Sequence, residues 1–357
     1  GSGQSFLNKS TIHTRMADIH NGVANLPEEY KGQGVIIGMI DAGIDLMHPD
    51  FQDANGDTRI LEIWDQTLEF DAQYTPVYGY GQVYDSTDIN NNICPTIDNP
   101  AFYGHGTNTT GITAGKGSSS VNAELAGYAT ESSILIVVSN FQDTTWTATV
   151  ADAVHYLFSR AEAYGMPCVI NASLGNYSGS HDGRDIPTQI MNDLITDTTG
   201  RIMVCAAGNS GETPPYHLGY ESSSDTNFTW FQTASNATYG NGQVYFEIFG
   251  DLNDFESIHF SVGADKITPN FEYRGHIPFA TVVDRLYVVH TDTLLSSSGN
   301  YLGIVQSAAD SLNGTYRLAF FVSLIDSINF NYSLLATGSG RLDLWCTANP
   351  QISGLND

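Results

Sequence analysis

The chain has 357 residues, with 39 acidic against 13 basic side chains and a formal net charge of −26. That length accommodates one large domain or two ordinary ones, each with its own hydrophobic core. The charge argues against nucleic acids and anionic membrane surfaces as partners, because both are bound by clustered cations. No segment reaches the roughly 18 continuous apolar residues that span a bilayer, so we expect no membrane span.

Residues 1–30 are predicted to form an N-terminal segment, and its opening Gly-Ser-Gly is typical of a vector-derived tag. No signal peptide is recognisable, but few charged residues and many Gly, Tyr, Asn, Ser and Thr favour an exported, periplasmic or extracellular protein. The four cysteines lack the Cys-x-x-Cys spacing of zinc or redox sites. Cys168 and Cys205 lie in apolar runs, so we expect them to be buried free thiols.

Over residues 31–219, short apolar runs alternate with amphipathic stretches. Continuous apolar runs are typical of parallel strands that are covered on both faces, and the stretches between them have helical spacing. The pattern predicts an α/β domain, a doubly wound and mostly parallel sheet with helices on both faces. Its catalytic groups should lie at the carboxyl ends of strands. The predicted strands are 35–40, 134–138, 168–173 and 202–206, and the predicted helices cover 150–161 and 186–194.

After about residue 220 the helical periodicity fades, and the polar stretch 220–228 marks a predicted domain boundary. Short aromatic and β-branched runs separated by Gly, Asn and Asp then continue over residues 228–350. This spacing predicts an all-β domain, an antiparallel sandwich or jelly roll. Its predicted strands include 243–249, 285–290, 316–322 and 341–345.

Three polar residues follow predicted strands or open a helix in the α/β part. Asp41 comes directly after a buried strand, and a carboxylate there can orient an imidazole. His105 lies between two glycines at the start of a Gly- and Thr-rich helix, and histidine transfers protons near neutral pH. Asn209 lies in a Gly-Asn-Ser-Gly turn, where its amide can stabilise an oxyanion. Taken alone, Asp41 is better explained as a turn or helix cap, and Asn209 as an ordinary turn asparagine.

Taken together, these segments resemble the subtilisin-like serine proteases, or subtilases, whose triad order is Asp, His, Ser. The resemblance covers roughly residues 30–215. It rests on the segment from Gly34 through Asp45 with His48-Pro49-Asp50-Phe51, on Gly104-His105-Gly106-Thr107, and on Asn171-Ala172-Ser173-Leu174-Gly175. It implies that Asp41 is the orienting acid, His105 the general base and Asn209 the oxyanion donor. It also implies that a peptide or protein substrate pairs with the strand of Ser173, Leu174 and Gly175.

The nucleophile of that family is absent from the sequence, because no Gly-Thr-Ser tripeptide occurs. A β-rich segment follows Asn209 instead. This layout resembles a bacterial subset of subtilases, related to proteases that process spore-germination factors, with a jelly-roll domain inserted before the serine helix. It implies that the serine lies in a missing C-terminal part, that the chain alone is inactive, and that its α/β domain exposes an apolar face which that part covers.

Two other functions stay open at this point. A non-catalytic relative would lack the nucleophile and hold a peptide in the cleft or on the β domain. Alternatively, the aromatic residues of the β-rich part are those of a carbohydrate-binding module, although such residues also fill sandwich cores.

Metal binding has a weaker basis in the sequence. The stretch Asp53–Asp57 resembles a calcium loop, but Thr58 replaces its glycine and Trp64 its closing glutamate. An Asn-Gly turn ahead of a strand over 60–64 explains it better. Asp50 matches a position that binds a structural calcium ion in some members of the family, so the resemblance implies that such an ion is possible here. No other metal or cofactor is expected.

Overall fold

The computed structural model describes residues 7–23, 25–176, 178–209, 217–223, 225–231, 234–236, 240–266, 275–325, 330–346 and 352–356. The chain folds into two compact units. The first comprises Gly1–Leu174 and Pro187–Ala207, and the second comprises Gly175–Ile186 and Gly208–Asp357.

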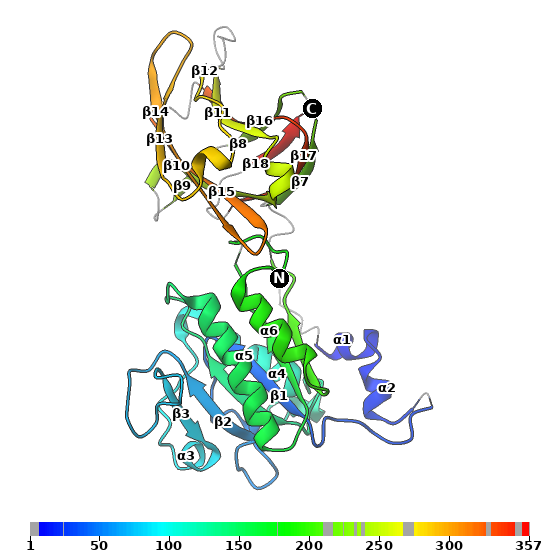
Figure 1. Ribbon diagram of the computed structural model, residues 1–357. Helices are drawn as coiled ribbons and strands as arrows, with labels where there is room; N and C mark the ends of the chain where they lie inside the picture. The colour runs from blue at the N-terminus through cyan, green and yellow to red at the C-terminus, as the bar shows by residue number, and fades with distance from the viewer. Residues whose placement is uncertain are drawn as a thin grey trace. The chain divides into compact units, whose positions relative to one another are not determined.

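Within the described residues, the first unit is built around a six-stranded sheet in the order β3-β2-β4-β1-β5-β6. Figure 1 labels three of its strands, β1, β2 and β3, with β3 beside β2. Neighbouring strands are parallel except for β3, which runs antiparallel to β2. The mostly parallel sheet is therefore confirmed, with each strand predicted from its apolar run found within a residue or two of its expected bounds. The strands are β1 Ile36–Asp41, β2 Ile60–Asp65, β3 Gln82–Asp85, β4 Ser133–Val138, β5 Cys168–Ala172 and β6 Arg201–Cys205.

Helices cover both faces of this sheet, because side chains alternate along each strand. Ile36 and Ile40 of β1 share one core with the apolar side of α5, whereas Ile37 and Met39 share the opposite core with Ala114 of α4. No helix in the described part of the chain has the length and apolar character needed to cross a membrane. The helices are α1 Leu7–His13, α2 Met16–His20, α3 Ser86–Asn90, α4 His105–Ala114, α5 Trp146–Ala163 and α6 Ile186–Thr196, with 3₁₀ turns at η1 Pro49–Phe51, η2 Pro100–Phe102 and η3 Val121–Ala123.

Strand β6 forms one of the two edges of the sheet, and some of its apolar side chains are exposed. Ile202 and Val204 are 53% and 52% exposed, and Ile190 of α6 is 46% exposed. The prediction that Cys205 is buried is wrong, because it lies on this open edge strand, whereas Cys168 on the interior strand β5 is buried. Both cysteines are free thiols, as predicted.

A buried carboxylate ties α5 to β2. Glu62 is 6% exposed, and it accepts hydrogen bonds from Arg160 (2.8 Å), Tyr156 (2.7 Å) and Tyr164 (2.8 Å). Burial raises the pKa of the Glu62 carboxyl, but these hydrogen bonds outweigh burial and hold that pKa below its usual value of 4.5. The charged form of Glu62 therefore stabilises the fold.

Replacing Glu62 by glutamine is expected to lower the free energy of unfolding by about 2 kcal/mol at neutral pH, because Arg160 loses its charged acceptor. Because the pKa of Glu62 is lower in the folded state than in the unfolded state, its charge stabilises the fold above the unfolded-state pKa. This stabilisation is lost as the pH falls through the folded-state pKa. The difference between Glu62→Gln and wild type should therefore shrink below pH 4.5 in urea titrations. Glu162→Gln is the matched control, because Glu162 is 73% exposed in its ion pair with Arg201. We expect less than about 0.5 kcal/mol for it.

The second unit is all-β apart from two short helical turns in its described residues. One sheet has seven strands, in the order β13-β14-β15-β10-β17-β7 with β9 beside β10, and the other has the order β12-β11-β16-β8-β18. The strands are β7 His217–Ser222, β8 Asn227–Phe231, β9 Ala234–Asn236, β10 Gly240–Asp251, β11 His259–Lys266, β12 Gly275–His276, β13 His290–Leu295, β14 Tyr301–Leu312, β15 Thr315–Leu324, β16 Phe330–Thr337, β17 Gly340–Cys346 and β18 Ile352–Asn356. The helical turns are α7 Leu252–Phe255 and η4 Val283–Arg285.

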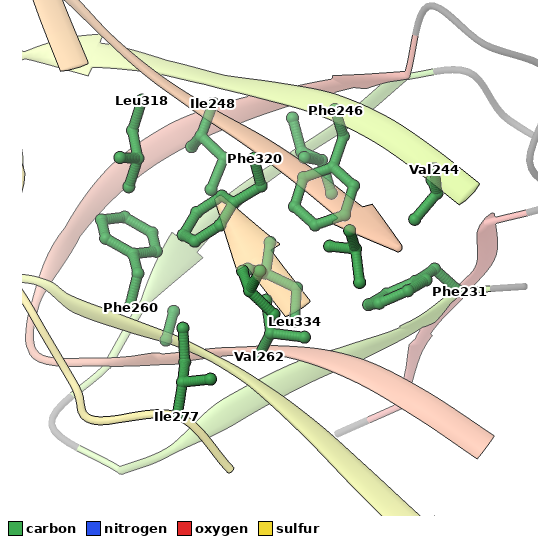
Figure 2. Close-up of a cluster of buried hydrophobic side chains, with 14 of the residues drawn as sticks. Phe231, Val244, Phe246, Ile248, Phe260, Val262, Ile277, Leu318, Phe320 and Leu334 are labelled. Atoms are coloured by element: carbon green, nitrogen blue, oxygen red, sulfur yellow. The ribbon is translucent and has the colours of Figure 1, made fainter. Parts of the chain in front are cut away.

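The two sheets enclose an apolar core. Figure 2 shows Phe246 and Phe320 of one sheet facing Val262 and Leu334 of the other, with Phe231 at the side. These aromatic side chains are nearly inaccessible to solvent, so they fill the core rather than present a surface for a glycan.

The predicted strand at 285–290 is wrong. A 3₁₀ turn ends at Arg285, Tyr287 has a positive φ of 59°, and β13 begins only at His290. The turn forms instead of a strand because two side chains bond each other's backbone. Asp284 Oδ2 accepts the N–H of Thr281 at 2.8 Å, and Thr281 Oγ1 accepts the N–H of Asp284 at 3.2 Å.

The chain enters the second unit earlier than the predicted boundary at 220–228. Strand β7 begins at His217 and pairs antiparallel with β17, with His217 opposite Trp345. The second unit includes the residues from Gly208 onward.

Candidate active site

The first candidate residue, Asp41, lies at the carboxyl end of β1 with only 3% of its surface exposed. One carboxylate oxygen, Oδ1, accepts the backbone N–H of Ala42 at 2.7 Å. The other, Oδ2, accepts the hydroxyl of Thr109 at 2.8 Å. Both bonds fix the plane of a carboxylate that the sheet has withdrawn from water.

His105 is the first residue of α4, and its Nδ1 lies 2.8 Å from Oδ1 of Asp41. A carboxylate accepts hydrogen bonds, so this contact places the proton of the neutral ring on Nδ1 and leaves the Nε2 lone pair free. The His105 side chain is 46% exposed, whereas that of Asp41 is 3% exposed. The pair therefore consists of a buried carboxylate behind an imidazole ring that is nearly half exposed.

Two glycines allow close backbone approaches around the Asp41–His105 pair. A Cβ on Gly106 would lie 1.8 Å from the carbonyl oxygen of Gly43, and a Cβ on Gly43 would lie 2.4 Å from the carbonyl oxygen of Ile97. Gly43 also has a φ of +146°, which other residues rarely adopt. These close backbone contacts explain Gly43, two residues after Asp41, and Gly106, directly after His105.

The N-terminus of α4 is capped from outside the helix, because its own N-cap residue is Gly104. Oδ2 of Asp98 accepts the backbone N–H of Thr107 at 3.0 Å, and the Thr107 hydroxyl accepts the N–H of Asp45 at 2.8 Å. The cap holds the first turn, and with it His105, against the β1 end of the sheet.

Replacing Gly106 by alanine is expected to destabilise the protein by more than about 3 kcal/mol, because the clash is with backbone that cannot rotate away. Gly111→Ala on the same helix is the matched control, since its Cβ would meet no atom within 4 Å. That variant should be about 0.5–1 kcal/mol more stable than wild type, because alanine favours the helix. Urea denaturation followed by circular dichroism measures both, and equal stabilities of the two variants would contradict the close-approach argument.

Comparison with known proteins agrees with this geometry. The profile of the subtilase family matches residues 32–248. Thermitase of Thermoactinomyces vulgaris is 25% identical over 291 residues, which cover 80% of this chain and 84% of thermitase. The PII-type proteinase of Lacticaseibacillus paracasei is 28% identical over 194 residues, covering 51% of this chain and 10% of that protein.

The chain belongs to the subtilase family. Among solved structures, the Clostridium perfringens CspB protease has a similar fold, with a TM-score of 0.71 at 19% identity. The match covers 96% of this chain and 68% of that one.

The other predicted site residues of this subtilase are distributed between its two units. Ser173 and Leu174 follow β5 in the first unit, and Ser173 accepts a hydrogen bond from Asn171 at 3.0 Å. Gly175 is exposed and begins the short segment that belongs to the second unit. Asn209 is also exposed, four residues after the end of β6. The roles of Ser173, Leu174, Gly175 and Asn209 stay predictions.

The described residues of this subtilase offer no group of three or more His, Cys, Asp or Glu arranged for a metal ion. Oδ1 of Asp50 instead accepts the backbone N–H of Ser119 at 2.9 Å, which ties two loops together. The stretch after Asp53 is the predicted turn, since Asp53 Oδ1 accepts the N–H groups of Asn55 (2.7 Å) and Asp57 (3.1 Å). These contacts do not fit a calcium site, and no step of the chemistry is assigned to a metal.

Sequence reasoning missed two residues that position the pair. Thr109, which bonds Asp41, lies four residues after His105 on α4. Helical spacing places the two side chains on the same face of the helix, so the sequence could have indicated it. Asp98 caps α4 from a loop, and no local pattern in the sequence connects it to that helix.

Proposed function

We propose that the chain is the N-terminal part of a serine endopeptidase with an Asp-His-Ser triad whose nucleophilic serine lies outside these residues. The observation that carries the proposal is the Asp41–His105 hydrogen bond, because it holds the ring in the tautomer that a general base requires. A protein released from catalysis gains nothing from a buried acid set behind a half-exposed imidazole.

In the proposed mechanism, the serine Oγ bonds to the peptide carbonyl carbon while His105 Nε2 takes its proton. Asn209 and a backbone N–H donate to the oxygen that becomes negative. His105 then delivers the proton to the leaving nitrogen as the C–N bond breaks, and a water molecule hydrolyses the acyl-enzyme by the reverse sequence of proton transfers. An extended substrate pairs with the backbone of Ser173, Leu174 and Gly175.

Two observations support a further segment that carries the serine. The sequence contains no Gly-Thr-Ser. Ile202 and Val204 of β6 also leave an apolar face of the sheet exposed, although such faces are normally covered in stable proteins. In this proposal the second unit is a jelly-roll insertion between Asn209 and the serine helix, and the missing C-terminal part continues the sheet beyond β6. We further propose that the enzyme is exported, as subtilases commonly are.

The coding sequence downstream of Asp357 tests the proposal first. We expect the reading frame to continue into a Gly-Thr-Ser segment. The gene product should then hydrolyse casein, whereas residues 1–357 alone should not. A stop codon directly after Asp357, or a continuation with no such serine, would favour a non-catalytic relative that binds peptides.

A further inference from the structure

Two histidine rings of the second unit stack on one tryptophan. Residues 178–186, here called the latch segment, belong to this unit together with the residues from Gly208 onward. The His181 ring of the latch segment stacks on the Trp345 indole with centroids 3.7 Å apart, and the His217 ring of β7 stacks on the same indole at 4.1 Å. Both rings are nearly parallel to the indole, at 20° and 24°. Two titratable rings therefore share one aromatic partner.

The hydrogen-bond partners of His181 select its charged form. Its Nδ1 lies 2.9 Å from the carbonyl oxygen of Gly179, and its Nε2 lies 3.4 Å from the carbonyl oxygen of Asn176. A carbonyl oxygen can only accept, so each ring nitrogen needs its own proton to make both bonds. A neutral imidazole has one proton and would turn a lone pair toward one of these oxygens. The geometry therefore fits the imidazolium cation.

The stack on Trp345 favours the same charged form. A cation over the face of an aromatic ring is attracted by the negative charge of that face, and tryptophan is the strongest partner for such a contact. The backbone of His181 also depends on these contacts, because its φ of +54° is left-handed. A non-glycine residue keeps that conformation only where its surroundings fix it. Protonation of the ring thus strengthens the contacts that fix the backbone.

His217 differs from His181 in the partner that it faces. Its Nε2 lies 2.8 Å from Oδ1 of Asp343 on β17. A neutral ring with its proton on Nε2 makes this hydrogen bond as well as a charged ring does. His217 can therefore stay stacked on Trp345 in either protonation state, and we expect the change with pH to come from His181.

Two further side chains of the latch segment keep their charge while histidine titrates. Nη1 of Arg184 donates to Oδ1 of Asp251 at 2.5 Å, and this contact raises the pKa of the guanidinium. Burial raises the pKa of the Asp182 carboxyl, but hydrogen bonds outweigh burial and hold that pKa below its usual value of 3.8. Both charges are therefore constant between about pH 5 and pH 8, where histidine changes its charge.

An ion pair faces the latch segment from the sheet. The N–H of Gly179 donates to Oε2 of Glu247 on β10 at 3.4 Å, and Oε1 of Glu247 lies 2.9 Å from Nη1 of Arg317 on β15. This contact holds the start of the segment through its backbone. It involves no histidine, so it should persist when His181 loses its proton.

We propose that His181 is a pH-operated latch within the second unit. In its charged form the ring bonds two carbonyl oxygens and stacks on Trp345, which holds residues 178–186 against the sheet. When the ring loses its proton, one carbonyl bond and the cation–π attraction are lost, and the segment opens more often. Because the held state binds the proton more tightly than the open state, the latch weakens as the pH rises. The inference concerns the second unit alone and is independent of the proposed function.

Hydrogen–deuterium exchange of residues 1–357 at about pH 5.5 and about pH 8 tests the latch across the range in which histidine titrates. Each measured rate is divided by the intrinsic rate at that pH to give a protection factor. The amides of residues 178–186 should be protected about tenfold more at the lower pH. His181→Phe keeps a stacking ring but carries no charge, so its latch segment should be protected equally at both pH values. Amides of β10 and β15 report whether each variant is folded.

Three other variants identify the ring that titrates. His217→Phe should keep the pH dependence of the wild type, since His217 makes its contact in the neutral form. His259→Phe is the matched control, because His259 is an exposed histidine on β11 in the other sheet. Trp345→Phe should reduce the pH dependence, since phenylalanine is a weaker partner for a cation. Equal protection of the wild-type segment at both pH values would overturn the proposal, as would a wild-type pH dependence in His181→Phe or its loss in His217→Phe.

Discussion

Replacing His105 by alanine in the full gene product is expected to lower kcat for peptide hydrolysis by about 10⁶-fold, with little change in KM. The ring is proposed to be the base that takes the nucleophile's proton and the acid that protonates the leaving group. Without it the serine must attack unassisted. The side chain is 46% exposed at the first position of α4, so its removal should leave the fold intact.

His155→Ala is the matched control for this variant. His155 is also an exposed histidine of the first unit, but it lies on α5 and bonds the hydroxyl of Tyr78. Its removal should change kcat by less than a factor of about three, since surface substitutions cost little. If His105→Ala retained activity within tenfold of wild type, a different residue would have to be the base.

Replacing Asp41 by asparagine is expected to lower kcat by about 10⁴-fold. The amide can present its N–H₂ group to Nδ1 of His105, which reverses the hydrogen bond and moves the ring proton to Nε2. The ring then lacks a free lone pair where the serine needs one. Thr109 would still bond the remaining oxygen, whereas the backbone N–H of Ala42 would lose Oδ1 as its acceptor.

Asp152→Asn serves as the control for the charge change, because Asp152 lies on α5 and accepts the hydroxyl of Tyr80 at 2.9 Å. Steady-state kinetics should show wild-type kcat for it. The pH profile adds an independent check. The activity that Asp41→Asn retains should rise with pH as hydroxide replaces the missing base, and a profile identical in shape to wild type would argue against the assigned tautomer.

The α/β unit was predictable because each buried parallel strand is a continuous apolar run, and the strands over 35–40, 134–138, 168–173 and 202–206 are all present. The Asp41–His105 contact was implied by the resemblance to the subtilases, and the structure shows it at 2.8 Å.

Other features depend on contacts between distant residues, which local patterns do not encode. Residues 285–290 have strand-like composition but follow a turn that Asp284 and Thr281 stabilise. Cys205 is exposed at the carboxyl end of the edge strand β6, and its apolar neighbours in the sequence give no sign of this. The loop over 175–186 reads as part of the α/β domain in sequence, and only its packing on Trp345 and Thr315 assigns it to the β unit.

The central claim is that Asp41 and His105 serve a serine that lies beyond Asp357. Labelling the full gene product with a fluorophosphonate probe, followed by mass spectrometry of the tryptic peptides, tests it most directly. The account predicts a single adduct on a serine C-terminal to Asp357, and its loss in His105→Ala. A product that takes up no probe, or one labelled on a serine within residues 1–357, would contradict it.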